Sequence, residues 1–170
     1  LCSIIALPFF PSNLHAALTL AQKGKSDYRI VIATNAIASE RYAAEELQQY
    51  LAKITSLTLP IVTEVEKPQA REILLGSTVH RGKVEAPASL ETLGTDGFIL
   101  RTDGSRLIIA GGPPRGTLNG VYTFLEERLG VRWFTPELER VTPTNRLVIP
   151  TLNETRVPAL EYREVFWTEI

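Results

Sequence analysis

The sequence is poor in the residues that build disulfide frameworks and metal centres. Of its 170 residues only Cys2 is a cysteine, which excludes an internal disulfide framework and a cysteine-rich metal site. The two histidines, His15 and His80, have no second ligand at metal-binding spacing, so we expect no metal ion. His80 lies in a Thr-Val-His-Arg-Gly stretch and is interpreted as a solvated loop residue. Since no Gly-x-Ser-x-Gly motif is present either, we expect no cofactor and no nucleophilic hydrolase site.

An excess of charge of one sign is also lacking. The chain has 18 Lys and Arg residues against 19 Asp and Glu residues, a formal net charge of −1. The basic residues are scattered, so the sequence gives no indication of a nucleic-acid or polyanion partner. A hydrophobic content of 44% and this length are typical of one globular domain with a real core.

The N-terminal segment has no acidic residue, lysine or arginine before Lys23. Its apolar run at 1–10 is too short to span a bilayer and is interrupted by Pro8, so we expect no transmembrane segment. The run is similar to the apolar region of a secretory signal. We therefore assign 1–21 to a truncated secretory signal and expect an exported protein, periplasmic or extracellular.

The details of this signal leave alternatives open. Small residues allow cleavage after Ala16 or Ala17. The positively charged start and the initiator methionine are missing, so we expect the sequence to begin inside the signal or at a non-ATG start read as Leu1. A lipoprotein with Cys2 at the end of its lipobox is one alternative, and an ordinary buried N-terminal helix is another.

Apolar periodicity predicts a series of strands and two helices. A first helix is expected to be capped by Ser39 and to bury one face, which consists of Ala43, Leu47, Tyr50, Leu51 and Ile54. A second helix is expected to bury Leu118, Val121, Tyr122, Leu125 and Leu129 and to stop at Gly130. Strands are predicted at 28–33, 59–64, 71–76, 97–102, 105–110, 131–134 and 146–149.

Two glycines in this series have predicted structural roles. Gly104, with Asp103, supplies the positive φ that a tight hairpin between 97–102 and 105–110 requires. Gly120 lies beside the apolar stripe of the second helix and would allow this helix to approach the sheet closely.

A glycine-rich loop precedes the second helix. Gly111, Gly116 and Thr117 are spaced as in a phosphate-binding P-loop, but the lysine that should follow the second glycine is missing. Pro113 and Pro114 remove two of the backbone amides with which such a loop would hold phosphate. We therefore interpret the loop as a tight crossover and keep a nucleotide-binding α/β domain as an alternative.

The residues that follow carry a resemblance to a known family. The segment reads GG-x-x-RGTLNGVYTFLEE-x-LGVRWFTP, and it is preceded by IVIATNAIASERYAAEELQQYLAKITSLTLPIV, by REILLGS and by DGFILRT-x-x-SRLIIAGG. Together these segments resemble the N-terminal, non-catalytic domain of family 67 glycoside hydrolases, the α-glucuronidases. They are more distantly similar to the second domain of family 20 β-hexosaminidases. In those enzymes the domain precedes a (β/α)8 barrel that carries the catalytic carboxylates.

The resemblance covers 28–151 and implies an α+β fold. The expected architecture is an α/β sandwich, in which a mixed β-sheet carries two main helices packed on one face. After the signal at 1–21, we assign 22–155 to an α-glucuronidase N-terminal-like domain. The remainder, 156–170, is interpreted as a linker into, or the first strand of, an absent (β/α)8 barrel.

Four residues are candidates for contact with substrate or with another domain. Glycoside hydrolysis needs two carboxylates flanking one bond, and the acidic residues here mostly lie on exposed helix faces, so no catalytic residue is assigned. Arg115, where the resemblance places an arginine, either contacts the catalytic domain or substrate or ties down loop carbonyls. Trp133, next to Phe134, either stacks on a sugar or packs under a loop. Arg163 and Trp167 either reach a substrate or pack at the junction with the barrel.

The resemblance implies a non-catalytic accessory domain of a secreted bacterial glycoside hydrolase, α-glucuronidase-like and acting in polysaccharide degradation. Alone, the chain is expected to have no hydrolytic activity. Its expected partner is the missing catalytic barrel, and an oligosaccharide is a second candidate. The alternative is a stand-alone carbohydrate-binding module, which predicts exposed aromatic side chains and saturable binding of oligosaccharide.

Overall fold

A mixed six-stranded sheet forms the centre of the fold. The computed structural model describes residues 17–82 and 90–159. The strand order is β10-β5-β6-β4-β2-β3, with β3 and β10 at the edges. Strands β3, β2, β4 and β6 run parallel to one another, whereas β5 is antiparallel to β6 and β10 is antiparallel to β5. The bounds are β2 Arg29–Ile32, β3 Ile61–Thr63, β4 Glu72–Leu75, β5 Phe98–Asp103, β6 Arg106–Gly111 and β10 Asn153–Arg156.

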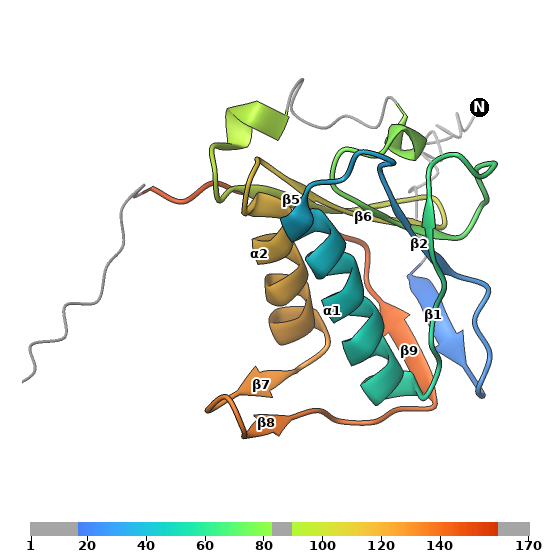
Figure 1. Ribbon diagram of the computed structural model, residues 1–170. Coiled ribbons are helices and arrows are strands. Elements are labelled where there is room, and N and C mark those ends of the chain that lie inside the picture. The colour runs from blue at the N-terminus through green and yellow to red at the C-terminus, as the bar shows by residue number, and fades with distance from the viewer. Residues whose placement is uncertain (1–16, 83–89, 160–170) are drawn as a thin grey trace, which may run out of the picture.

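Two helices lie side by side on one face of this sheet (Figure 1). These are α1 (Ala38–Thr55) and α2 (Gly116–Thr123), and α2 continues as a π-helical turn, η3 (Phe124–Arg128). The α+β fold with both helices on one side is therefore confirmed. Each strand sends alternate residues to the two faces, so the face under the helices is lined by every second residue.

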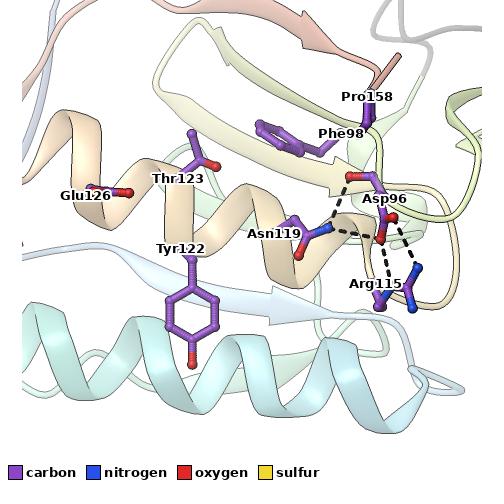
Figure 2. Close-up of a pocket in the computed structure, with 8 residues that line it drawn as sticks. All are labelled: Asp96, Phe98, Arg115, Asn119, Tyr122, Thr123, Glu126 and Pro158. Atoms are coloured by element: carbon purple, nitrogen blue, oxygen red, sulfur yellow. Dashed lines mark hydrogen bonds and ion pairs between the residues drawn. The ribbon is translucent and has the colours of Figure 1, made fainter. Parts of the chain in front are cut away.

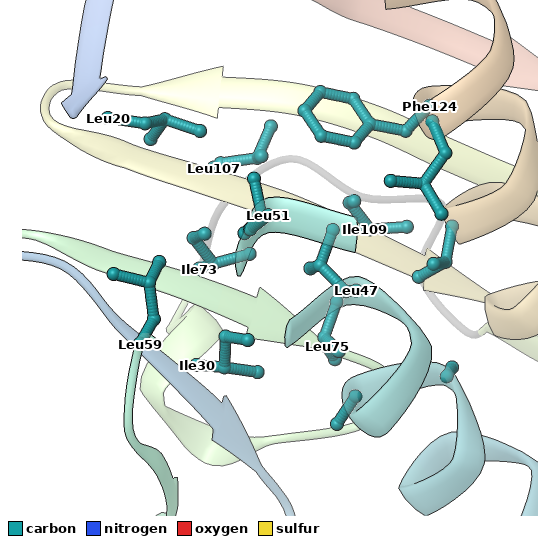
Figure 3. Packing of buried hydrophobic residues seen from close by; sticks show 14 of the residues in the cluster. Leu20, Ile30, Leu47, Leu51, Leu59, Ile73, Leu75, Leu107, Ile109 and Phe124 are labelled. Carbon is teal, nitrogen blue, oxygen red and sulfur yellow. The ribbon is translucent and has the colours of Figure 1, made fainter. Parts of the chain in front are cut away.

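The main hydrophobic core fills the space between the sheet and the helices (Figure 3). Leu47 and Leu51 of α1 project toward the strands, and both are almost completely buried. Burying each such side chain stabilises the fold by roughly 1.5–3 kcal/mol. The strand residues of this core are Ile30, Ile73, Leu75, Leu100, Leu107 and Ile109.

A second, smaller cluster covers the opposite face of the sheet. Its strand members are Val31, Leu74, Ile99, Ile108 and Ala110, and all are fully buried. Leu90 and Leu93 belong to the same cluster and come from the short 3-10 helix η2 (Leu90–Leu93). Because both faces are covered, the strands read as continuous apolar runs instead of alternating ones.

Two small sheets flank the central one. Strand β1 (Leu18–Gln22) pairs antiparallel with β9 (Arg146–Ile149), and β7 (Arg132–Trp133) pairs antiparallel with β8 (Glu139–Arg140). Leu18 and Leu20 of β1 are buried in the main core. The division predicted at residue 21 therefore falls within a strand, whereas cleavage after Ala16 or Ala17 would leave β1 whole.

Two local predictions need correction. Helix α1 begins at Ala38, and the side chain of Ser39 donates to the backbone oxygen of Pro114 instead of capping the helix. The hairpin turn between β5 and β6 consists of Gly104 and Ser105, because Asp103 still pairs with Arg106. The positive φ of 55° at Gly104 agrees with the prediction for this glycine.

The second helix approaches the sheet closely at Gly120, as predicted. A Cβ atom on Gly120 would lie 2.9 Å from Cγ2 of Ile109 and 3.3 Å from Cβ of Phe98. The sequence did not identify Phe124, which is fully buried one residue before Leu125. Within the described parts of the chain, no helix combines the length and apolar character needed to cross a membrane.

Candidate functional site

A polar cluster beside a pocket surrounds Asp96, at the start of α2. Arg115 precedes the helix, and its Nε and Nη2 donate to the two carboxylate oxygens of Asp96 at 2.7 and 3.1 Å. Asn119, one turn into α2, donates from Nδ2 to the backbone oxygen and Oδ1 of Asp96, both at 3.3 Å. This two-point pairing of guanidinium and carboxylate fixes orientation as well as charge. It ties the loop before β5 to the first turn of α2.

A pocket of about 540 Å³ lies along this cluster. Figure 2 shows that Phe98, Thr123 and Pro158 line it together with the polar residues, and that Tyr122 points from α2 toward α1. The side chain of Arg115 is 58% exposed. The hydrogen bond to Asp96 raises the pKa of Arg115 above its ordinary value, so the arginine stays charged at this surface. The guanidinium of Arg115 is tied to the carboxylate of Asp96, a contact that neither interpretation of this residue included.

A cluster of aromatic side chains lies at the other end of α2. Trp133 of β7 makes edge-to-face contacts with Tyr50 of α1 and Tyr122 of α2, with ring centroids 5.4 Å apart in both pairs. The indole Nε1 of Trp133 donates to the hydroxyl of Tyr50 at 2.6 Å. Trp133 is 36% exposed and Phe134 is 59% exposed, so this pair is not core under a loop.

Charged groups complete the aromatic cluster. The hydroxyl of Tyr50 donates to Oε2 of Glu139 at 2.6 Å, and Nζ of Lys53 donates to Oε1 at 2.5 Å. The hydrogen bond from Lys53, followed by that from Tyr50, lowers the pKa of Glu139. Burial, with a smaller contribution from Glu139, raises the pKa of Tyr50. At neutral pH Glu139 is therefore a carboxylate and Tyr50 a neutral phenol.

The glycine-rich loop before α2 is packed backbone against backbone. The amides of Gly112 and Arg115 donate to the backbone oxygens of Gly97 and Thr95, and the amide of Gly111 donates to Oγ1 of Thr117. The Pro113–Pro114 peptide bond is cis. These amides are engaged inside the chain, so they are not arranged to hold a phosphate. The loop forms the tight crossover that the sequence predicted.

A buried charge cluster lies on the opposite face of the sheet. Glu72 at the start of β4 is fully buried and accepts from Nη2 of Arg29 at 2.7 Å, while Nε of Arg106 lies 3.7 Å from its other oxygen. These residues begin the neighbouring parallel strands β2, β4 and β6. Buried charges of this kind need partners, and here they provide them for one another. We assign the cluster a structural role.

His80 belongs to this buried cluster, which corrects its interpretation as a solvated loop residue. It lies in the 3-10 helix η1 (Val79–Arg81) and is only 6% exposed. Its Nδ1 is 3.3 Å from Oε1 of Glu72, and its Nε2 is 3.1 Å from the backbone oxygen of Glu64. The segment after β4 folds back over the sheet, so the histidine meets a carboxylate eight positions earlier in the chain.

The structure separates the predicted contact residues from one another. Arg115 and Trp133 lie at opposite ends of α2, and Tyr122 is the residue they share, because it lines the pocket of Arg115 and contacts the ring of Trp133. Arg163 and Trp167 lie outside the described residues. Across 17–82 and 90–159, no group of three His, Cys, Asp or Glu side chains is arranged to hold a metal ion.

Comparison of the sequence with known protein families identifies the family of this domain. Residues 13–124 match the family described as glycosyl hydrolase family 67 N-terminus. The chain belongs to this family. The match confirms the resemblance found in the sequence and covers the sheet as far as β6, both helices and the Arg115 loop. The sequence has no match among curated proteins.

Solved structures of glycoside hydrolases share the fold of this family 67 N-terminal domain. A family 115 4-O-methyl-α-glucuronidase with specificity for decorated arabinogalactans is 18% identical, with a TM-score of 0.57 over 85% of this chain. The β-N-acetylhexosaminidase of Streptomyces coelicolor A3(2), from family 20, is 13% identical, with a TM-score of 0.51 over 88%. A Streptomyces plicatus β-hexosaminidase is 15% identical, with a TM-score of 0.50 over 87%. The chain spans 19%, 26% and 24% of these proteins, so it corresponds to one part of each.

Proposed function

We propose that this chain is the non-catalytic N-terminal accessory domain of a larger glycoside hydrolase, whose reaction takes place in a (β/α)8 barrel elsewhere in the polypeptide. The observation that carries the proposal is the family match over residues 13–124. The small share of each structural relative that the chain covers adds support. An α-glucuronidase-like reaction on a polysaccharide is the activity proposed for the whole protein, by analogy alone.

The chemistry of the carboxyl groups supports a non-catalytic role. A glycosidase general acid needs a raised pKa, so that it still carries a proton near neutral pH. In Glu64, Glu72, Glu127 and Glu139 the pKa is instead lowered by hydrogen bonds and neighbouring positive charges, which outweigh burial where burial opposes them. These four groups are therefore suited to ion pairs and not to proton donation.

The Arg115 cluster is proposed as a contact with the catalytic domain. Its pocket is lined by Asn119, Thr123 and Pro158, and Pro158 belongs to the segment 156–170 that we interpret as leading into the barrel. Arg115 is more than half exposed while its orientation is fixed by Asp96. A fixed, exposed guanidinium is suited to pairing with a carboxylate or a backbone oxygen of a neighbouring domain.

Two versions of the parent polypeptide test the accessory role. The coding sequence beyond Ile170 should specify a barrel of about 250 residues. The intact polypeptide should hydrolyse its substrate, and deletion of residues 17–159 should leave the barrel insoluble or much less stable. Continuation into an unrelated domain, or a barrel that is fully stable and active after this deletion, would contradict the proposal.

We also propose that the protein is exported, with cleavage after Ala16 or Ala17. The apolar N-terminal run supports this, and so does the start of β1 at Leu18, because cleavage there would retain the strand that pairs with β9. Mass spectrometry of the mature protein from the periplasm or culture medium tests it. A mature N-terminus at residue 17 or 18 is expected, and a protein retaining residues 1–16 would contradict it.

A further inference from the structure

The aromatic cluster at the end of α2 has features of a prepared binding site. Trp133 is held by its hydrogen bond to Tyr50 and by edge-to-face contacts on two sides, so the orientation of its ring is set before any ligand arrives. Phe134, next in the chain, is 59% exposed. Both rings line one pocket of about 350 Å³, within the range of about 300–1,000 Å³ usual for small-ligand sites.

The polar groups of this pocket are mainly acceptors and hydroxyls. Glu139 lines it, and its side chain is 31% exposed even though each oxygen already accepts one hydrogen bond. A carboxylate has about four lone-pair sites, so Glu139 can still accept from hydroxyl donors. Thr135 and Pro136 complete the lining, and Lys53 balances the charge of Glu139 from outside the pocket.

We propose that the pocket formed by Tyr50, Trp133, Phe134 and Glu139 binds a neutral sugar residue of a polysaccharide. A pyranose ring offers an apolar C–H face to aromatic rings and hydroxyl donors at its edge, which matches a rigid indole, an exposed phenyl ring and a carboxylate acceptor. The inference rests on the proposed function, because that function brings the chain close to polysaccharide.

The charge of the pocket selects among sugars. Glu139 and Lys53 together contribute no net charge, and the carboxylate is the member that lines the pocket. A uronate would place a second carboxylate near Glu139, and like charges at short distance repel each other. The site therefore favours the neutral backbone sugars of a decorated polysaccharide over its uronic acid substituents.

Tryptophan fluorescence of the 170-residue chain tests this site directly. The sequence has two tryptophans, so the W167F variant leaves Trp133 as the single reporter. We would titrate it with xylohexaose, cellohexaose and a β-1,4-linked galactan oligosaccharide, and with glucuronic acid. At least one neutral oligosaccharide should give a saturable change in emission, with a dissociation constant on the order of 1 mM, and glucuronic acid should bind about tenfold more weakly or not at all.

Two further variants separate loss of binding from loss of folding. Phe134→Ala should raise the dissociation constant about tenfold or more while leaving the unfolding midpoint nearly unchanged, because the ring is mostly exposed. Leu138→Ala is the matched control, since Leu138 is 57% exposed in the same hairpin but does not line the pocket. It should change the constant by less than about twofold.

Several outcomes would overturn the sugar site. These are no response to any of the three neutral oligosaccharides, equal binding by the Phe134→Ala variant, or tighter binding of glucuronic acid. Self-association that Phe134→Ala abolishes, without a sugar response, would assign the surface to a protein contact instead. None of these results affects the accessory-domain proposal, which fails separately if the same samples release reducing sugar.

Discussion

Glu40, in the first turn of α1, accepts a hydrogen bond from the backbone amide of Ser77, with its Oε1 atom 3.3 Å from the nitrogen. Its other oxygen accepts from the amide of Ile37 at 3.2 Å, so one carboxylate satisfies a donor at the helix start and a donor in the loop after β4. Gly76 makes room for it, because a Cβ atom there would lie 2.0 Å from Oε1 of Glu40. The helix is thereby fastened to the carboxyl end of the sheet.

Replacing Glu40 by alanine should destabilise the fold by about 2–3 kcal/mol, because two partly buried backbone amides would lose the buried carboxylate that they bind. Chemical denaturation gives the free energy of unfolding. The matched control is Glu45→Ala on the exposed side of the same helix, which should change it by no more than about 0.5 kcal/mol. Equal effects of the two substitutions would refute this role for Glu40.

Gly112→Ala should be strongly destabilising for a steric reason. A Cβ atom at Gly112 would lie 1.7 Å from the backbone oxygen of Gly94, which cannot move without shifting the loop before β5. We expect a loss of about 3 kcal/mol or more in the free energy of unfolding.

The control for Gly112 is Gly24→Ala. Gly24 has a φ of +70° and no atom within 4 Å of the added Cβ, so only backbone conformation opposes the change. It should cost about 1–2 kcal/mol. If thermal or chemical denaturation shows that Gly112→Ala costs no more than this, the crossover is looser than the structure indicates.

The buried Glu72 should make stability depend on acid pH. Burial would raise its pKa, but hydrogen bonds from Arg29 and the amide of Gln69, with the charge of His80, lower it below the ordinary 4.5. A carboxyl with a lowered pKa binds fewer protons when folded than when unfolded. Its contribution to stability is therefore complete above about pH 4.5. This contribution is lost as the pH falls through the lower pKa that Glu72 has in the folded protein.

Glu72→Gln should flatten this part of the curve of unfolding free energy against pH. It should also destabilise the protein at pH 7 by about 3–5 kcal/mol, because Arg29 would lose a buried charged partner. Glu66→Gln removes an exposed partner of the same arginine and should leave the slope nearly unchanged. Urea denaturation at a series of pH values between 3 and 7 provides the comparison, and an unaltered slope in Glu72→Gln would count against the assignment.

Much of the fold could be predicted because its signals are local. The strands β2, β4, β5, β6 and β9 and the buried face of α1 follow from apolar periodicity, and the turn at Gly104 follows from a residue that tolerates positive φ. Phe124 escaped prediction because the helix widens into a π-helical turn from that residue onward. The extra residue in the turn shifts the apolar stripe and brings Phe124 and Leu125 inward together.

The candidate site was less predictable because its contacts are distant in sequence. Arg115 was singled out by the sequence, but its partner Asp96 lies 19 positions earlier and has no local signal. The burial of His80 depends on how η1 folds back over β4, and the exposure of Trp133 depends on packing between α1 and α2. Burial and exposure of these side chains are decided by tertiary packing. The residue pattern within one segment carries no information about that packing.

The measurement that tests the central claim most directly is release of uronic acid and reducing sugar by the purified 170-residue chain, incubated with glucuronic-acid-bearing xylo-oligosaccharides. The intact parent polypeptide is assayed beside it. We predict no release above the buffer control by the chain alone and clear release by the parent. Hydrolysis by the chain itself, abolished by substitution of one of its own carboxylates, would contradict a non-catalytic domain.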